Sequence, residues 1–425
     1  MHSLAHTSPE IDALEAKAML AAQAGREAEA VQLWNRILEL APNHTRTLNA
    51  LGQRAFRQGD IPYARAAFQR IVEADGTVPQ QWIQLAVACR RLNDEMAEER
   101  AIQGALRIDP RDLVALILRA NLLDRQGKVH QAFQAHGAVA AVAPPMQQLP
   151  PDLRPAVTEA FAHLAKYNKD KGAFLDSYLD QFYPTFAGEN LNRFRTSVDI
   201  MVGRKKRFDS QSLQYHYPNL APIEFFDRGE FPWLDAVEQA THEIRDEFLE
   251  VLNTEEGFTP YISYPPGVPV NQFAELNNSP RWNAFHLFKL GQRVDANAAR
   301  CPGTMAVLEH VPQPDQAGRT PAAMFSLLSP RTTIPAHVGV SNARLVTHLP
   351  LIVPENCYFR VGNDTRQWIP GKAWVFDDTI ENEARNESDK LRVVLIFDIW
   401  HPHLTPPERT MITALTAGLN AFEAG

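Results

Sequence analysis

Small residues that favour turns recur through the first third of this chain with a period of about 34 residues. Gly59 follows Gly25 by one period and Gly127 follows Gly59 by two, and Asn93 occupies the missing place. Further sets keep the same period: Pro42, Pro110 and Pro144 with Gly76 between them; Ala30, Ala64 and Ala132 with Glu98 as the exception; and Gly52, Ala86 and Ala120. Such a period predicts stacked structural units, because one unit of this length cannot bury its apolar face alone.

Each unit is predicted to hold two helices. The segment 27–34 places Ala30, Leu33 and Trp34 on one helical face. A Gly or Asn suits the left-handed residue that ends the first helix, and a proline stops the second. Over residues 10–145 the pattern resembles tetratricopeptide repeats. The resemblance implies a concave surface that binds a peptide or partner protein; an array that only caps or dimerises the downstream domain is the open alternative.

Composition and charge narrow the class of protein. The chain has 425 residues, enough for two or three domains, and a net charge of −8, which argues against a nucleic-acid partner. Its cysteines, Cys89, Cys301 and Cys357, are widely spaced and odd in number, as expected in a reducing compartment. Residues 1–6 lack a signal-peptide pattern and no apolar run is long enough to span a bilayer. A cytoplasmic protein without a membrane partner is therefore expected.

Prolines interrupt the repeat array near residue 145, and a helical connector is expected over residues 146–205. From 206 to 412, short apolar segments alternate with turn residues, which is typical of a sandwich or jelly roll. The expected strands are 283–290, 322–328, 343–352, 357–361, 373–376 and 391–399. One helix is expected from 235 to about 252, another begins near Pro406, and residues 413–425 are assigned to a C-terminal helix and tail.

A histidine, an asparagine and an arginine carry the candidate chemistry. His337 lies at a predicted strand end, Asn382 lies in the segment 375–384, and Arg392 opens an apolar segment shortly after it. A metal-ligand motif, a later ligand position and an arginine at this distance beyond it have the spacing of 2-oxoglutarate oxygenases. Here, however, the later ligand position holds asparagine.

Residues 210–410 resemble the aspartyl/asparaginyl β-hydroxylase family of iron- and 2-oxoglutarate-dependent dioxygenases. The matching segments are His337-Val338-Gly339, 344–351, 361–364, 371–383 and 392–402, with Tyr264-Pro265-Pro266-Gly267, Arg281-Trp282 and Cys301-Pro302 upstream. The resemblance implies a double-stranded β-helix. The whole chain is therefore expected to be an α+β multidomain protein, with an α-helical tetratricopeptide solenoid followed by a double-stranded β-helix, or jelly roll.

The resemblance also implies the cofactors Fe(II) and 2-oxoglutarate and the residues that hold them. His337 and Asn382 take the metal-binding and catalytic positions, and the His-x-Gly motif leaves no third protein ligand. Arg392 takes the family's place for the distal carboxylate of 2-oxoglutarate, where a guanidinium makes a two-pronged contact. Ser326 and His348 match additional polar contacts to this cosubstrate.

Asn382 stands where the family pattern has a histidine between two glutamates. An amide oxygen is a weaker donor to iron(II) than an imidazole nitrogen. Three interpretations stay open: an enzyme that works with His337, water and the cosubstrate; a natural pseudoenzyme that keeps the pocket; or a substituted variant. Neighbouring carboxylates could reach a metal through water: Asp377, Asp378, Glu381 and Glu383.

The predicted activity is hydroxylation of the β-carbon of an Asp- or Asn-type residue, in a peptide or protein delivered by the repeats. The alternative is a catalytically silent scaffold that keeps the 2-oxoglutarate pocket and acts through binding of proteins to the repeats. Asn382 is the residue that separates these two hypotheses.

Overall fold

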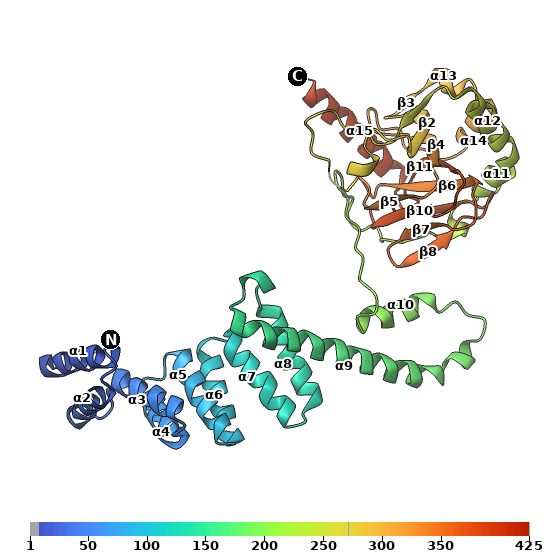
Figure 1. Cartoon of the computed structure of the whole chain (residues 1–425). Coiled ribbons are helices and arrows are strands. Elements are labelled where there is room, and N and C mark those ends of the chain that lie inside the picture. The colour runs from blue at the N-terminus through green and yellow to red at the C-terminus, as the bar shows by residue number, and fades with distance from the viewer. Residues whose placement is uncertain (1–7, 271, 425) are drawn as a thin grey trace. The chain divides into compact units, whose positions relative to one another are not determined.

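The computed structural model describes residues 8–270 and 272–424, and the chain forms two compact units, residues 1–190 and 191–425. Figure 1 labels the elements of both units. Residues 1–6, on which the expectation of no signal peptide rests, lie outside the described residues. No helix in the described ranges combines the length and the apolar character needed to cross a membrane.

The first unit consists of helices. In chain order they are α1 (Pro9–Gln23), α2 (Glu27–Leu40), α3 (Thr45–Gln58), α4 (Ile61–Ala74), α5 (Pro79–Arg91), α6 (Glu95–Ile108), α7 (Leu113–Arg125), α8 (Val129–Val142), the 3-10 turns η1 (Met146–Gln148) and η2 (Pro151–Leu153), α9 (Arg154–Asp180) and η3 (Tyr183–Phe186). The even-numbered helices α2 to α8 begin at residues 27, 61, 95 and 129, and α3, α5 and α7 begin at 45, 79 and 113. Every interval equals the period of the turn residues, so the predicted helical-repeat solenoid is confirmed.

The turn inside each repeat has the predicted backbone. Gly25, Gly59, Asn93 and Gly127 have positive φ angles of 74°, 86°, 55° and 67°. A side chain in this left-handed region meets its own backbone, and glycine and asparagine are the residues that tolerate it. The sequence period therefore reflects a backbone requirement that recurs once in every helix pair.

The second unit holds two antiparallel sheets. Within the described residues, the larger sheet has the order β1-β2-β4-β11-β6-β9 with β3 beside β2, and the smaller has the order β5-β10-β7-β8. The larger sheet contains β1 (Phe258–Pro260), β2 (Trp282–Lys289), β3 (Gln292–Arg293), β4 (Ala323–Leu328), β6 (Arg344–Ile352), β9 (Trp374–Phe376) and β11 (Arg392–Trp400). The smaller contains β5 (Thr332–His337), β7 (Cys357–Val361), β8 (Asp364–Gln367) and β10 (Asn382–Asn386).

Helices cover the outer face of the larger sheet (Figure 1). The helices of this unit are α10 (Asn192–Met201), η4 (Arg228–Glu230), α11 (Leu234–Gln239), α12 (Thr241–Thr254), η5 (Ala274–Leu276), α13 (Asp295–Ala298), α14 (Pro302–Leu308) and α15 (Pro406–Glu423). Phe248 of α12 packs edge-on against Phe325 of β4, with ring centroids 5.2 Å apart. Because side chains alternate along a strand, residues next to Phe325 point to the other face, toward the smaller sheet.

The six expected strands correspond to β2, β4, β6, β7, β9 and β11. Strands β1, β3, β8 and β10 were not among them, and β5 was recognised only as the strand end that carries His337. All residues of the β10 segment except Ala384 are polar, so the segment lacks the alternation of apolar and polar residues that predicts a strand. The predicted helix from 235 to 252 is broken into α11 and α12 at Ala240. Helix α15 runs unbroken through residue 412, where the sequence pattern had set a domain limit.

One prediction concerns the packing of the solenoid. Gly104 on α6 faces the ring of Trp82, and a Cβ added there would collide with that ring. The ring cannot swing away freely, because its Nε1 donates to the Gly76 carbonyl oxygen at 3.0 Å. We expect Gly104→Ala to destabilise the repeats by about 1–3 kcal/mol. Hydrogen exchange of α5 and α6 amides in the full chain measures the effect.

Gly137→Ala is the matched control. Gly137 also lies inside a helix, α8, but nothing stands within 4 Å of its added Cβ. Alanine should therefore be neutral or stabilising there by up to about 1 kcal/mol, through helix propensity alone. Equal protection in both variants would contradict the packing role of Gly104.

Candidate functional site

The five candidate residues line one cavity of about 480 Å³ in the second unit. They are Ser326, His337, His348, Asn382 and Arg392. Each comes from a different strand, and the pairing of strands within both sheets brings these distant parts of the chain together. The predicted residues are thus gathered at one place, and none of them lies elsewhere in the fold.

Strand register sets which side chains face the cavity. Asn382 of β10 lies directly opposite His337 of β5 in the smaller sheet. In the larger sheet, β4 and β6 pair with opposite edges of β11. Ser326 of β4 lies opposite Val394 of β11, and His348 of β6 lies opposite Ile396 of β11. With a side-chain period of two, the inward residues of β4, β6 and β11 include the polar Ser326, His348 and Arg392 together with the apolar Val394 and Ile396.

Arg392 is a buried cation without a carboxylate partner among the described residues. Its side chain is 1% exposed, and its Nη1 donates to the backbone oxygen of Ser326 at 3.3 Å. Its guanidinium lies 4.8 Å from the centroid of the Trp368 ring. The Nε is buried without a hydrogen-bond acceptor, and burial lowers the pKa of Arg392 to about 10. A guanidinium in this state offers its remaining donors to an anionic ligand.

His348 and Ser326 lie beside this guanidinium and present hydrogen-bond donors. Nδ1 of His348 accepts from Nε1 of Trp368 at 3.3 Å, so the imidazole carries its proton on Nε2. Burial, and then the nearby charge of Arg392, lower the pKa of His348 well below its usual value, which keeps the ring neutral. The Ser326 oxygen accepts from Nε1 of Trp282 at 3.2 Å and keeps its own proton for another partner.

His337 is oriented for coordination through Nε2. Its Nδ1 lies 2.8 Å from the carbonyl oxygen of Pro335, which fixes the proton on that nitrogen. Burial lowers the pKa of His337, so the lone pair on Nε2 is available at neutral pH. Metal-binding histidines of known sites also donate their second ring N–H to a backbone carbonyl oxygen or a carboxylate, as His337 does to Pro335.

Hydrogen bonds from its amide nitrogen hold the side chain of Asn382 in place. The side chain is 3% exposed, and Nδ2 donates toward the carbonyl oxygens of His337, Asp378 and Ile380 at 3.3, 3.0 and 3.1 Å. Three acceptors around one amide nitrogen fix the orientation of the group. The amide oxygen is therefore the atom that Asn382 presents to the cavity it lines.

A carboxylate occupies the space next to His337 that the His-x-Gly motif leaves open. A Cβ added at Gly339 would collide with the carboxyl group of Asp378. One oxygen of Asp378 accepts from Nη2 of Arg344 at 3.0 Å. The other, Oδ1, is buried and has no hydrogen-bond partner within residues 8–270 and 272–424. The glycine thus makes room for a carboxylate that comes from the loop before β10.

Arg344 is shared by two acidic residues on the cavity wall. Its guanidinium lies 3.0 Å from Asp378 and 3.2 Å from Asp398, and all three side chains are at most 14% exposed. Burial raises the pKa of Asp398 to about 6, although Arg344 opposes this effect. The charge of Arg344 is consequently neutralised inside the protein, in contrast to that of Arg392.

The positions of Arg344 and Trp368 in the cavity were not predicted from the sequence, and Asp378 was predicted only as one of four acids that could reach a metal through water. Its contacts with Gly339 and Arg344 distinguish Asp378 from the other three acids. Trp368 lies in the apolar core of this unit and also contacts Arg392 and His348. His286 of β2, a further histidine of the larger sheet, is not among the residues that line the cavity.

Comparisons with known proteins find similar hydroxylases. A family model described as aspartyl/asparaginyl β-hydroxylase matches residues 238–402. The chain is 34% identical over 200 residues to the ornithine lipid ester-linked acyl 2-hydroxylase of Rhizobium tropici, covering 46% of this chain and 67% of that protein. It is 33% identical over 173 residues to the human aspartyl/asparaginyl β-hydroxylase, covering 40% of this chain and 21% of that protein.

Among solved structures, the MamA protein is similar to this chain with a TM-score of 0.31 and 17% identity, covering 39% of this chain and 95% of that one.

The fold of the second unit and its cavity, taken with these matches, define a hydroxylase domain. The chain belongs to the aspartyl/asparaginyl β-hydroxylase family. The match spans two thirds of the length of the bacterial relative and about a fifth of the human one.

The two buried arginines of the cavity should respond in opposite ways to substitution. Arg392→Met removes a buried charge that lacks an acid, so we expect stability to be unchanged or raised by about 1–4 kcal/mol. Arg344→Met leaves Asp378 and Asp398 buried without a cation, which should cost about 3–5 kcal/mol. Denaturant unfolding of the full chain followed by Trp fluorescence measures both. Equal destabilisation by both variants would show that Arg392 already has an internal partner.

Proposed function

We propose that the second unit is an Fe(II)- and 2-oxoglutarate-dependent dioxygenase that hydroxylates a carbon next to a carbonyl group. The buried and unpaired guanidinium of Arg392 is the observation that carries this proposal. A protein gains little from burying a charge in this way unless a ligand of opposite charge completes the site. The hydroxylase family of the chain supports the reaction class.

The cosubstrate would bind at the Arg392 end of the cavity. The distal carboxylate of 2-oxoglutarate would accept hydrogen bonds from the free nitrogens of Arg392 and from the hydroxyl of Ser326. The neutral His348 would donate its Nε2 proton to the same ligand. The apolar residues Val346, Phe359, Phe376 and Ile396 line the same cavity and would exclude water from it.

The metal would bind at the other wall. His337 offers Nε2, Asn382 offers its amide oxygen, and Asp378 offers the free Oδ1 that can accept a hydrogen bond from a metal-bound water. This donor set suits a divalent ion but is weaker than two imidazoles. When bound, the iron with 2-oxoglutarate and dioxygen supplies the oxidising power that converts a C–H bond to C–OH, while 2-oxoglutarate becomes succinate and CO2.

The proposed substrate is an Asp- or Asn-type residue of a peptide or protein, brought by the helical repeats and hydroxylated at its β-carbon. That carbon is adjacent to the side-chain carbonyl group. The same bonding relation holds for C2 of an ester-linked acyl chain, the position named for the bacterial relative.

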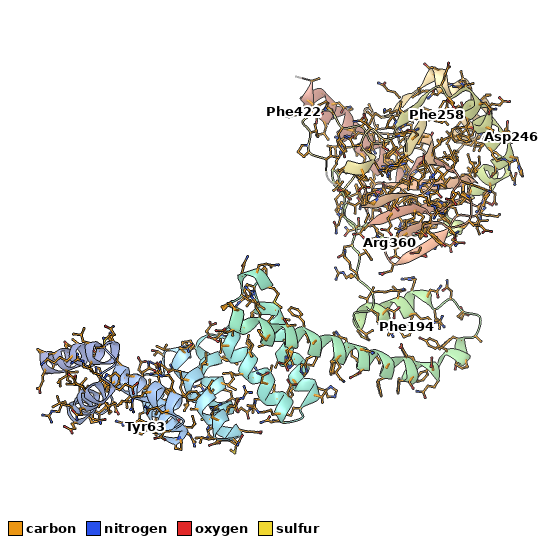
Figure 2. All side chains as sticks on the ribbon, in the orientation of Figure 1. Tyr63, Phe194, Asp246, Phe258, Arg360 and Phe422 are labelled. Atoms are coloured by element: carbon orange, nitrogen blue, oxygen red, sulfur yellow. The ribbon has the colours of Figure 1, made fainter. Side chains whose placement is uncertain are left out.

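The acyl chain is the second candidate substrate because the mouth of the cavity is flanked by apolar side chains. Leu415 and Leu419 of α15 line a hollow that shares Tyr215 and Arg319 with the main cavity. Phe422, labelled on α15 in Figure 2, is 85% exposed. Succinate formation with peptides and with ester-linked acyl lipids compares the two candidates directly.

The silent-scaffold hypothesis rests on Asn382 alone. The Asn382 side chain occupies the proposed position of the second metal ligand, and three carbonyl oxygens hold its amide nitrogen. Its amide oxygen then faces the cavity and would be a weak second donor to a metal. Under this hypothesis 2-oxoglutarate still binds, but iron does not bind and no succinate forms. The two experiments below distinguish cosubstrate binding from turnover.

The first experiment measures the affinity for 2-oxoglutarate by anaerobic calorimetry on the full chain. Arg392→Met should weaken binding at least about 100-fold, because two charge-assisted hydrogen bonds are lost. Arg360→Met is the matched control, since Arg360 of β7 is half-buried but paired with Glu381 and Glu383. We expect its affinity to equal that of the parent chain. Equal losses in both variants would exclude Arg392 as the carboxylate site.

The second experiment restores the missing imidazole. Asn382→His should bind iron(II) at least about 10-fold more tightly, because even outer partners of a ligand change affinity by 10–100-fold. Its production of succinate from 2-oxoglutarate should rise accordingly under air. Detectable succinate in the parent chain would favour the enzyme over the silent scaffold. Failure of both proteins to bind iron would contradict a metal site at His337.

A further inference from the structure

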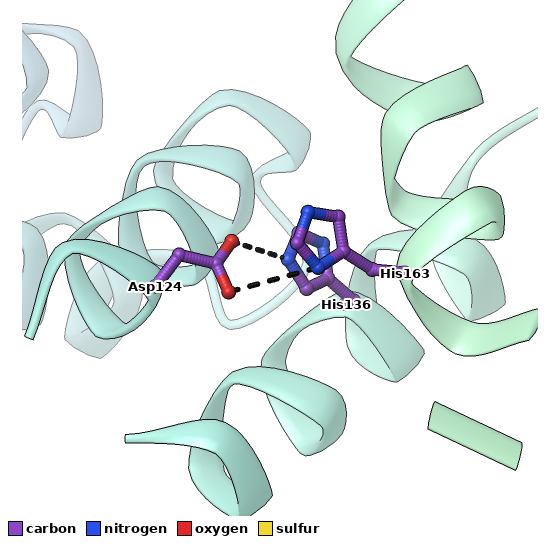
Figure 3. Close-up of side chains that lie close together, drawn as sticks. All are labelled: Asp124, His136 and His163. Carbon is purple, nitrogen blue, oxygen red and sulfur yellow. Dashed lines mark hydrogen bonds and ion pairs between the residues drawn. The ribbon is translucent and has the colours of Figure 1, made fainter. Parts of the chain in front are cut away.

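A second cluster of metal-ligating side chains lies in the first unit. Asp124 of α7, His136 of α8 and His163 of α9 converge on one point (Figure 3). Each offers one ligand atom, and these atoms all lie within 4.8 Å of one another. This cluster belongs to the repeat unit and is independent of the proposed dioxygenase activity.

The apolar packing of three helices creates this convergence. His136 is 2% exposed and shares its face of α8 with Ala132 and Val139. His163 shares its face of α9 with Ala160, which is buried in the same apolar cluster. The histidines therefore lie at the border of the contact that docks α9 on the last helix pair, and their positions are fixed by that contact.

The carboxylate of Asp124 lies close to the imidazole rings of both His136 and His163. Nε2 of His136 lies 2.7 Å from one oxygen of Asp124, and Nδ1 of His163 lies 3.8 Å from the other. The two rings stack with centroids 4.3 Å apart. Nδ1 of His136 is buried without a hydrogen-bond partner among the described residues. Protein groups alone thus leave this buried ring incompletely satisfied, which costs free energy.

We propose that Asp124, His136 and His163 bind a divalent transition-metal ion of the zinc class. Two imidazole nitrogens and one carboxylate form a common zinc donor set, with bonds of about 2.0–2.2 Å and water in the fourth position. His163, whose side chain is 40% exposed, is the ring that can turn to close the site.

Glu159 supports His163 from the other side of the ring. Its carboxylate lies 4.0 Å from Nε2 of His163, on the preceding turn of α9. Histidines that bind metals usually donate their second N–H to such an acceptor. With Nδ1 on the metal and Nε2 facing Glu159, the ring would have a partner at both nitrogens.

The bound ion would join α9 to α7 and α8. Its three ligands come from three helices, so binding requires the start of α9 to stay docked on the last repeat. The repeat unit would then end in a metal-stabilised helix, and loss of the ion would loosen α9 without altering the earlier repeats.

Cobalt(II) titration of the metal-free full chain tests the proposal, because tetrahedral cobalt has visible absorption bands. The His337→Ala background removes the imidazole of the other candidate site. We expect one cobalt per chain, displaced by zinc, and at least 30-fold weaker binding in Asp124→Asn and in His163→Gln. Zinc should also slow hydrogen exchange in the first turns of α9, and this protection should vanish in His163→Gln.

His130→Gln is the matched control. His130 also lies on α8, is exposed, and hydrogen-bonds Tyr167 at 2.8 Å rather than the cluster. Its cobalt affinity should equal that of the parent. Absence of stoichiometric binding, or binding that survives both Asp124→Asn and His163→Gln, overturns the proposal and leaves an Asp–His hydrogen bond as the sole role of the cluster. A His163→Gln chain with native circular dichroism excludes misfolding as the cause of lost binding.

Discussion

The proposed site depends on the guanidinium of Arg392, which is buried in the cavity and has no acidic partner in the part of the chain that the structure describes. Strand β11 places it there, with Val393, Leu395 and Phe397 packed on the outer face and Val394, Ile396 and Asp398 on the inner face beside it. Trp368 covers the cation and also fixes the tautomer of His348. In the same cavity Arg344 has two carboxylates, so the protein neutralises that cation internally. Under the proposed function, the other cation, Arg392, is left for a ligand.

The opposite wall combines a strong donor with a weak one. His337 and Asn382 face each other across two strands, and each is held by backbone carbonyl oxygens. Gly339 leaves the space that the Asp378 carboxyl group fills. At the proposed metal site, asparagine in the place where the family pattern has histidine would therefore lower the donor strength and preserve the shape of the site. This explains how one residue can decide between an active and a silent protein with the same fold.

The repeats were predictable from the sequence because residues suited to left-handed turns recur once in every helix pair. The five cavity residues were predictable because a family resemblance supplied their spacing. Strand β10 was missed because all of its residues except Ala384 are polar. The contact of Asp378 with Gly339 depends on register, which no local pattern reveals. The cluster of Asp124, His136 and His163 joins three successive helices and follows no spacing motif, so only the packing of those helices reveals it.

The most direct test is an anaerobic crystal structure of the full chain with manganese(II) and 2-oxoglutarate, with anomalous data at the manganese edge. The account predicts one anomalous peak in the cavity that contacts Nε2 of His337 and the amide oxygen of Asn382. The distal carboxylate of 2-oxoglutarate should lie on Arg392. A cosubstrate bound away from Arg392, or a cavity metal without contact to His337, would contradict the account.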